Sequence, residues 1–235
     1  MLHDLAESLI QSDPGVRFDV LKALNKLRSR DPRLVPPRSD VEDMLNAELM
    51  GYYRSFQILA AIDPNAGTAI LGPSSHGGES VLTRALRERM AFEFERIFRL
   101  LALLYPPRDV HNAFLGLTMG TSQRQANAQE VLEHLLQPDL YRRLVNGLDS
   151  EIPLREKVNF AHRLCGSSVN SRNEALRILL HSEDGWISAC ALYAVGEERL
   201  TELNGELSQV PHAADPLLEE TWQWATARLN AAIPT

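Results

Sequence analysis

The chain has 235 residues, of which 44% are hydrophobic, 23% charged and 6% aromatic, and its formal net charge is −7. This composition is typical of a folded globular protein, and the acidic balance disfavours general binding to nucleic-acid phosphates. The N-terminal residues carry acids without a basic start, and no apolar run reaches the about 18 residues that a membrane-spanning helix needs. We therefore expect a cytoplasmic protein that neither inserts into a membrane nor binds nucleic acid.

Helical periodicity dominates the N-terminal part, where strand-like alternation is scarce. A short helix fits residues 2–10. Asp13 is placed to cap the next helix, and Pro14 takes its first position, because proline needs no backbone donor there. We expect this second helix to cover about 16–29.

Two long helices are predicted next. Ser39 and Glu42 have the spacing of a capping box and open a helix over 40–62, along which apolar residues recur every three or four positions. Residues 63–79 are rich in Gly, Pro and Ser and predict a loop. The second long helix, over 80–105, is apolar nearly all round in its C-terminal half, which is typical of a helix central to a core.

Shorter helices with short links follow. Ser171 with Glu174 repeats the capping-box spacing, and Asp215 with Pro216 repeats the start in which a cap precedes a proline. This pattern is typical of antiparallel helix pairs. The expected spans are 108–118, 123–136, 139–148, 153–164, 172–182, 186–197, 200–209 and 216–231.

A weak internal repeat recurs at three helix starts. In each, apolar residues stand four and seven positions after a reference residue, which is Arg17, Arg124 or Ser188. The three sets are Asp13, Val16, Arg17, Leu21 and Leu24; Arg124, Ala128 and Val131; and Asp184, Ile187, Ser188, Leu192 and Val195. Because such positions share one helix face, we expect the apolar pairs to face a stack of neighbouring helices.

This pattern resembles the HEAT repeat, whose second helix often begins Asp-x-x-Val-Arg. The match is good over 13–24, fair over 184–194 and partial over 122–136. The resemblance implies an all-α fold, an irregular α-solenoid of antiparallel helix pairs with two long helices in its N-terminal half.

The same reasoning predicts one HEAT-like domain over 1–235. The alternative is a division near residue 106. It would separate a long-helix half, 1–105, from a short-helix half, 106–235.

Three segments resemble more specifically the HEAT-containing regions of bacterial transporter-like proteins. They are residues 16–28, 95–106 and 191–194. In those proteins a nucleotide-translocase-like or major-facilitator-like membrane part precedes the HEAT region. The resemblance implies a cytosolic regulatory or docking module, tethered to a membrane through a segment outside this sequence.

Four charged residues lie close to the apolar stripes of the two long helices: Glu48, Arg89, Glu93 and Arg96. Glu93 has both arginines at helical contact spacing. Charges beside an apolar face must be paired or reach water. We expect a salt-bridge network that joins the helices. The alternatives are a polar patch inside a binding groove and a carboxylate pair for acid–base chemistry.

Trp222 and Trp224 stand two residues apart in the last predicted helix and therefore face different directions. One interpretation is that a tryptophan covers the open end of the core. The other is an exposed partner surface, because aromatic side chains often carry binding energy.

No catalytic or metal-binding pattern stands out. Nucleophile-elbow, phosphate-loop and zinc-protease motifs are absent, and Ser75 and His76 are adjacent, which is poor geometry for a nucleophile and its base. The histidines are scattered, and Cys165 and Cys190 lack metal-site spacing. We expect buried, reduced thiols, no metal site and no cofactor.

The favoured hypothesis is a non-enzymatic scaffold that binds a protein partner or a domain of the same larger protein. We place its binding surface around the long helices and the 63–79 loop. One alternative is an enzyme on a HEAT scaffold, either DNA-base glycosylase-like, which the negative charge opposes, or bilin-lyase-like. Another is a structural element on the cytosolic side of a transporter.

Overall fold

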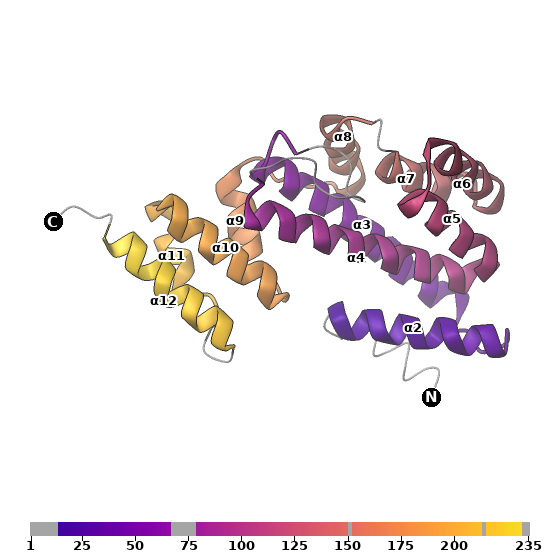
Figure 1. Ribbon diagram of the computed structural model, residues 1–235, viewed down its shortest axis with the longest axis horizontal. Helices are drawn as coiled ribbons and strands as arrows, with labels where there is room; N and C mark the ends of the chain where they lie inside the picture. Colours follow the sequence, from indigo (N-terminus) through magenta and orange to yellow (C-terminus); the bar gives the residue numbers. More distant parts are fainter. Residues whose placement is uncertain (1–13, 67–78, 150–151, 213–214, 232–235) are drawn as a thin grey trace. The chain divides into compact units, whose positions relative to one another are not determined.

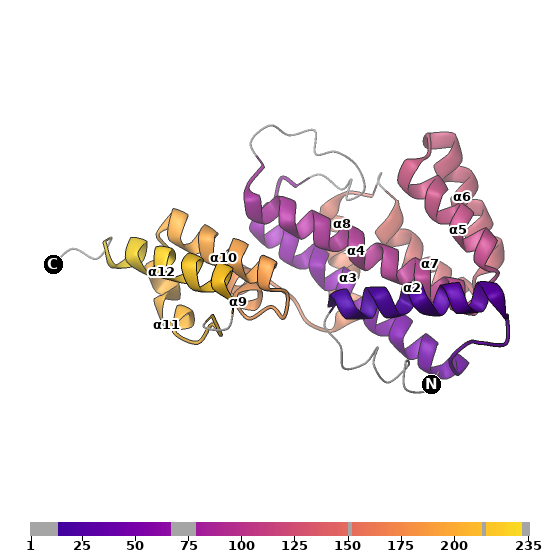
Figure 2. The same ribbon diagram turned by 60° about the horizontal axis from the view of Figure 1, so that its bottom comes forward.

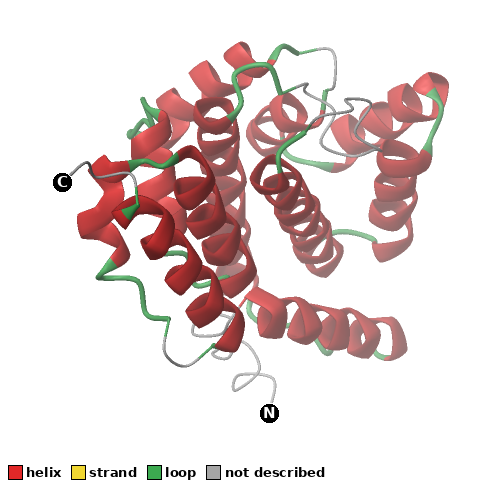
Figure 3. Cartoon of the chain, turned by 60° about the vertical axis from the view of Figure 1, so that its left-hand side comes forward, coloured by secondary structure: helices red, strands yellow, loops and turns green. Residues whose placement is uncertain are grey.

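The computed structural model describes residues 14–66, 79–149, 152–212 and 215–231. All regular structure within these ranges is helical, and Figure 3 draws no strand among them. The all-α prediction is confirmed. The expected helix over 2–10, the cap at Asp13 and the Ser75–His76 pair lie outside the described residues, as does most of the 63–79 loop.

The helices of the described ranges carry the labels of Figure 1. They are α2 (Pro14–Arg30), α3 (Arg38–Ile62), α4 (Val81–Leu104), α5 (Pro107–Met119), α6 (Ser122–Leu135), α7 (Pro138–Leu148), α8 (Leu154–Cys165), α9 (Arg172–Leu180), α10 (Gly185–Glu198), α11 (Asn204–Leu207) and α12 (Pro216–Asn230), with a 3-10 turn η1 (Thr201–Leu203) before α11. Both long helices are confirmed as α3 and α4. The helix expected over 200–209 is instead divided into η1 and α11.

Side-chain caps begin three of the later helices, as predicted for two of them. The Ser171 hydroxyl accepts a hydrogen bond from the Glu174 backbone N–H at 3.2 Å, at the start of α9. The carboxylates of Asp184 and Asp215 each accept from two backbone N–H groups at the starts of α10 and α12. These bonds satisfy donors that the first turn of a helix leaves free.

The prediction of a capping box at Ser39 and Glu42 is wrong. The Pro37 carbonyl already accepts the first helical hydrogen bond, from Val41, so α3 begins at Arg38 and Ser39 lies inside its first turn. The Ser39 hydroxyl faces the Asp40 carboxylate at 3.0 Å. Glu42 pairs with Arg38 at 2.8 Å instead of reaching back to a backbone donor.

Residue contacts divide the chain into two compact units. The described residues of the first are 14–56, 89–149 and 152–167, and those of the second are 57–66, 79–88, 168–212 and 215–231. The prediction of a single domain, or of a division near residue 106, stays a prediction. Each unit is described by itself.

The first unit has an aromatic core where α3 and α4 meet their neighbours. Edge-on, tilted and stacked ring pairs, with centroids 4.8–6.2 Å apart, link residues of α3, α4, α5 and α8. Aromatic pairs favour such spacings over face-to-face contact. The residues are Tyr52, Tyr53, Phe56, Phe94, Phe98, Phe114 and Phe160. In Figures 1 and 2, α2 runs beside the first-unit parts of α3 and α4.

The second unit is organised around α10. Its residues from Ile187 to Leu192 are all buried, and α12 lies alongside it in Figures 1 and 2. The two helices approach closely at Gly196, where a Cβ atom would lie 2.9 Å from the Ala225 Cα. Glycine is therefore required for this contact.

The repeat positions behave differently along the chain. Leu192 and Val195 have no exposed surface, and Leu21 and Leu24 are also buried, as the repeat predicts. The prediction is wrong for Val131, which is 43% exposed on α6. The helix face expected to meet a stack there is turned partly to solvent.

Candidate functional site

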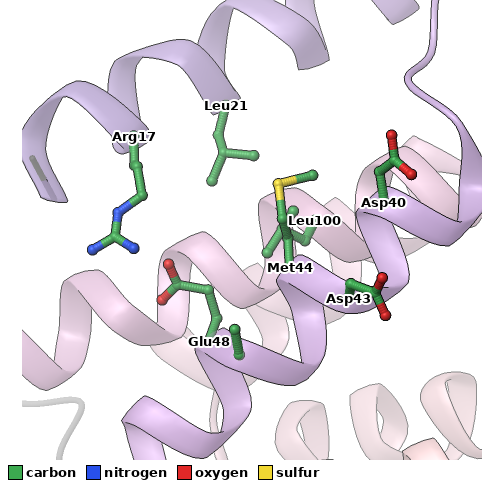
Figure 4. Close-up of a pocket in the computed structure, with 8 residues that line it drawn as sticks. Arg17, Leu21, Asp40, Asp43, Met44, Glu48 and Leu100 are labelled. Atoms are coloured by element: carbon green, nitrogen blue, oxygen red, sulfur yellow. The ribbon is translucent and has the colours of Figure 1, made fainter. Parts of the chain in front are cut away.

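A cavity of about 320 Å³ opens between α2 and α3 within the first unit. Figure 4 shows eight residues that line it. They are Arg17 and Leu21 from α2; Asp40, Asp43, Met44, Ala47 and Glu48 from α3; and Leu100 from α4. Pockets of this size that combine an apolar wall with a few polar groups are the usual form of a ligand site.

Apolar side chains form the middle of the cavity. Leu21 and Leu100 are fully buried beneath it, while Met44 is half-buried and Ala47 is exposed at the rim. In Figure 4 the side chains of Leu21, Met44 and Leu100 lie in the middle of the view. A group that enters the cavity would bury apolar surface there, which is the main favourable term in association.

Side chains further along α2 hold this helix against α4. The Asn25 amide donates to the Arg99 backbone carbonyl at 3.0 Å, and the Arg28 guanidinium donates to the Ala102 carbonyl. Phe18 contacts Phe92 edge-on, with ring centroids 5.9 Å apart. These contacts fix α2 on α4 and leave the cavity on the α3 side.

Arg17 stands at one end of the cavity, as Figure 4 shows. It makes no hydrogen bond or ion pair with any residue in the described part of the chain, and its Nε is buried with no acceptor. A buried donor that lacks a partner costs about 1–3 kcal/mol. In Figure 4 its guanidinium lies at the same end as the Glu48 carboxylate.

Asp40 and Asp43 stand at the other end of the cavity, as Figure 4 shows. Asp43 is exposed, and the Asp40 carboxylate faces the Ser39 hydroxyl. Neither carboxylate has a cationic partner within ion-pair distance among the described residues. This end of the cavity is therefore anionic.

The structure brings Glu48 and Arg96 together across α3 and α4. The Arg96 Nε lies 3.0 Å from both carboxylate oxygens of Glu48, and Nη2 lies 3.0 Å from Oε2. The two side chains are 12% and 9% exposed. Glu48 thus serves both the interhelical contact and the cavity wall, where Arg96 compensates its charge.

Glu93 forms a second polar contact deeper between the same helices. Its Oε1 accepts from the Ser55 hydroxyl at 3.1 Å and from the Arg89 Nε at 3.0 Å, while Oε2 is buried without a partner. Burial raises the pKa of this carboxyl above its ordinary value, against the opposing effect of Arg89. The four charged residues expected in a network thus make two contacts, Glu48 with Arg96 and Glu93 with Arg89.

Trp222 and Trp224 make separate contacts on α12. The Trp222 indole N–H donates to the Leu207 carbonyl at 2.8 Å, and the His212 ring stacks on it with centroids 4.1 Å apart. Trp224 stacks on Tyr193 at 5.0 Å. Both tryptophans are half-buried, so each covers neighbouring residues and keeps an exposed edge.

The two cysteines are free. Cys190 is buried, as expected, whereas Cys165 is half-buried, with its Sγ 3.7 Å from the Met50 carbonyl. Burial raises the pKa of both thiols, that of Cys190 to about 11. A raised pKa lowers the thiolate fraction and with it the reactivity of the thiol.

The sequence reasoning missed Lys157, which is only 1% exposed on α8. Its Nζ donates to the Gly147 carbonyl at 3.0 Å and lies 5.0 Å from the Phe56 ring centroid. Burial lowers the pKa of this amine to about 8. A signal was present, because Lys157 stands three residues after Leu154 and four before Ala161 on one helix face.

Comparisons with known proteins assign no class. No family model matches the chain, and no curated protein or solved structure is significantly similar to it. Within the described ranges, every helix is too short or too polar to cross a bilayer. Among the same residues, no group of three or more His, Cys, Asp or Glu side chains is arranged to hold a metal ion.

Proposed function

We propose that the chain is a non-enzymatic, HEAT-like helical module that binds a protein partner through the cavity between α2 and α3. The observation that carries the proposal is the cavity itself, in which charges of both signs that no described residue pairs surround an apolar middle. Protein interfaces commonly combine a buried apolar centre with a polar rim. A net charge of −7 favours association with a partner of opposite charge.

Two relationships support the HEAT-like arrangement. Glu48 faces Arg96 whereas Ser55, further along α3, faces Glu93, so contacts advance in opposite directions along α3 and α4, as in an antiparallel pair. On α10, Gly185 lies near Leu218 and Gly196 near Ala225, so α10 and α12 run in the same direction. Equivalent helices of successive stacked hairpins run parallel. The cytosolic location and a tether to a transporter-like membrane part belong to the same proposal.

Site-directed photo-crosslinking tests the proposal in cells of the native source. A benzophenone amino acid replaces Ala47 at the rim of the cavity, and in a control protein it replaces Glu133, which is exposed on α6. We expect a discrete protein adduct from position 47 that is absent from position 133. Met44→Glu, which places a charge in the apolar middle, should abolish the adduct while circular dichroism shows an unchanged fold. Equal adducts at both positions, or an adduct that survives Met44→Glu, would contradict the proposal.

A further inference from the structure

The cavity has two ends of opposite charge. Arg17 and Glu48 line one end, and Arg96, which lies outside the lining, already compensates the charge of the Glu48 carboxylate. Asp40 and Asp43 supply two carboxylates at the other end. Counted over the described residues, the first end therefore keeps the uncompensated positive charge of Arg17, and the second carries the negative charge of the two aspartates.

In the described part of the chain, no acceptor is left free for Arg17 at the positive end. Both oxygens of Glu48 are engaged by the Arg96 Nε at 3.0 Å, and the Arg17 Nε is buried without a partner. A carboxylate is the group best suited to this position, because guanidinium–carboxylate hydrogen bonds are about twice as strong as neutral ones. Arg96 offsets the repulsion that Glu48 would exert on such a ligand.

At the negative end, no cation of the described ranges pairs with either aspartate. Arg38, on the same turn of α3, pairs with Glu42 at 2.8 Å and not with either aspartate. Two neighbouring carboxylates favour an ammonium or guanidinium group, and charge complementarity of this kind fixes the direction in which a partner binds. Between the two ends, Leu21, Met44 and Leu100 offer only apolar surface.

We propose that the cavity binds a protein segment in one orientation, with an acidic group at Arg17, an apolar side chain over Met44 and a basic group at Asp40 and Asp43. This inference rests on the proposed function and names the chemistry that the partner must present. An apolar residue flanked by an acidic residue on one side and a basic residue on the other meets the requirement.

Methyl NMR with three small probes of equal chain length tests the inference. The chain has five methionines, so ¹³C-methyl labelling gives few signals. Met44 reports on the cavity, while Met119, which is 79% exposed on α5, controls for non-specific effects. The probes are 6-aminohexanoate, which carries both charges, hexanoate and hexylammonium. We expect 6-aminohexanoate to shift the Met44 methyl saturably, with a Kd on the order of 1 mM.

Hexanoate and hexylammonium, which each carry one charge, should bind the cavity at least about threefold more weakly than 6-aminohexanoate. This factor corresponds to the loss of one exposed charge interaction. Arg17→Gln should weaken 6-aminohexanoate and hexanoate and leave hexylammonium unchanged. The double variant Asp40→Asn, Asp43→Asn should weaken 6-aminohexanoate and hexylammonium and leave hexanoate unchanged. Arg30→Gln and Asp109→Asn, which alter exposed residues outside the cavity, should change none of the three.

The diagnostic result is a crossed pattern, in which Arg17→Gln weakens only the probes that carry a carboxylate and the double aspartate variant weakens only those that carry an ammonium group. Equal binding of all three probes, equal shifts at Met44 and Met119, or no shift at Met44 would overturn the inference. Its failure is distinguishable from failure of the proposed function. A specific crosslink at position 47 without the crossed pattern would support a partner site at the cavity and overturn the inference that the partner binds in one orientation. The crossed pattern without a crosslink would show that the cavity binds small molecules and would overturn the proposal of a protein partner.

Discussion

Arg96 of α4 holds both carboxylate oxygens of Glu48 of α3 at 3.0 Å through its Nε, in a contact where both side chains are mostly buried. Removing one partner leaves an uncompensated charge between the helices. We expect Arg96→Met to lower the free energy of unfolding by about 2–4 kcal/mol. Chemical denaturation monitored by circular dichroism measures this loss.

The double variant Arg96→Met, Glu48→Leu is the matched control. Replacing a buried ion pair by apolar side chains of similar volume is often nearly neutral, so the double variant should be more stable than Arg96→Met alone. Additive losses from the two single substitutions would show that the pair does not act as a unit.

Glu93 should make stability depend on pH. Burial raises the pKa of its carboxyl in the folded state, so the folded protein binds this proton more tightly than the unfolded chain. The stability that Glu93 contributes is present below the carboxyl's unfolded pKa of about 4.3 and is lost as pH rises through the folded value. The free energy of unfolding of the wild type, compared with that of Glu93→Gln, should therefore decrease as the pH rises from acidic to neutral. Urea unfolding at a series of pH values measures the difference, and a constant difference contradicts the expectation.

Lys157 should act in the alkaline range. The pKa of its amine is about 8 in the folded protein, against an ordinary value of 10.5 in the unfolded chain, so between these two pH values only the unfolded chain keeps the proton. The wild type should then gain up to about 3 kcal/mol relative to Lys157→Met as pH rises from 8 to 10.5. Unfolding in urea across this range measures the change. Lys22→Met, at a 53% exposed side chain, should stay within about 0.5 kcal/mol of the wild type at neutral pH.

The sequence predicted the helices well because their signals are local. Apolar periodicity located α3 and α4, and the side-chain caps at Ser171 and Asp215 stand where the spacing placed them. The capping box predicted at Ser39 does not form, because α3 begins two residues earlier than predicted and Ser39 lies inside its first turn.

The candidate site was less predictable because it depends on contacts between distant segments. Their places beside the apolar stripes selected Glu48 and Arg96, yet the cavity next to Glu48 also needs Arg17, which is distant in sequence from α3. Asp40 and Asp43 stand three residues apart and so share a helix face, but nothing local indicates that the face borders a cavity.

Gly196 lies where α10 and α12 approach each other closely. A Cβ atom there would lie 2.6 Å from the Trp224 Cζ3 and 2.9 Å from the Ala225 Cα, and a backbone atom cannot move aside cheaply. We expect Gly196→Ala to destabilise the protein by about 1–3 kcal/mol. Thermal or urea unfolding measures the loss, and tryptophan fluorescence reports displacement of Trp224. Gly205→Ala, with no atom within 4 Å of the added Cβ, is the control, and equal effects at the two positions would contradict the close contact.

Gly51 should respond with the opposite sign to the same substitution. It lies inside α3, is exposed, and has no atom within 4 Å of an added Cβ. Alanine restricts the unfolded chain and favours helix, so Gly51→Ala should raise the free energy of unfolding by about 0.5–1 kcal/mol. A loss of stability in urea unfolding would mean that a partner or another segment packs against this face of α3. Crosslinking at position 47, one turn away on α3, would then show whether the group packed against Gly51 belongs to the partner that binds the cavity.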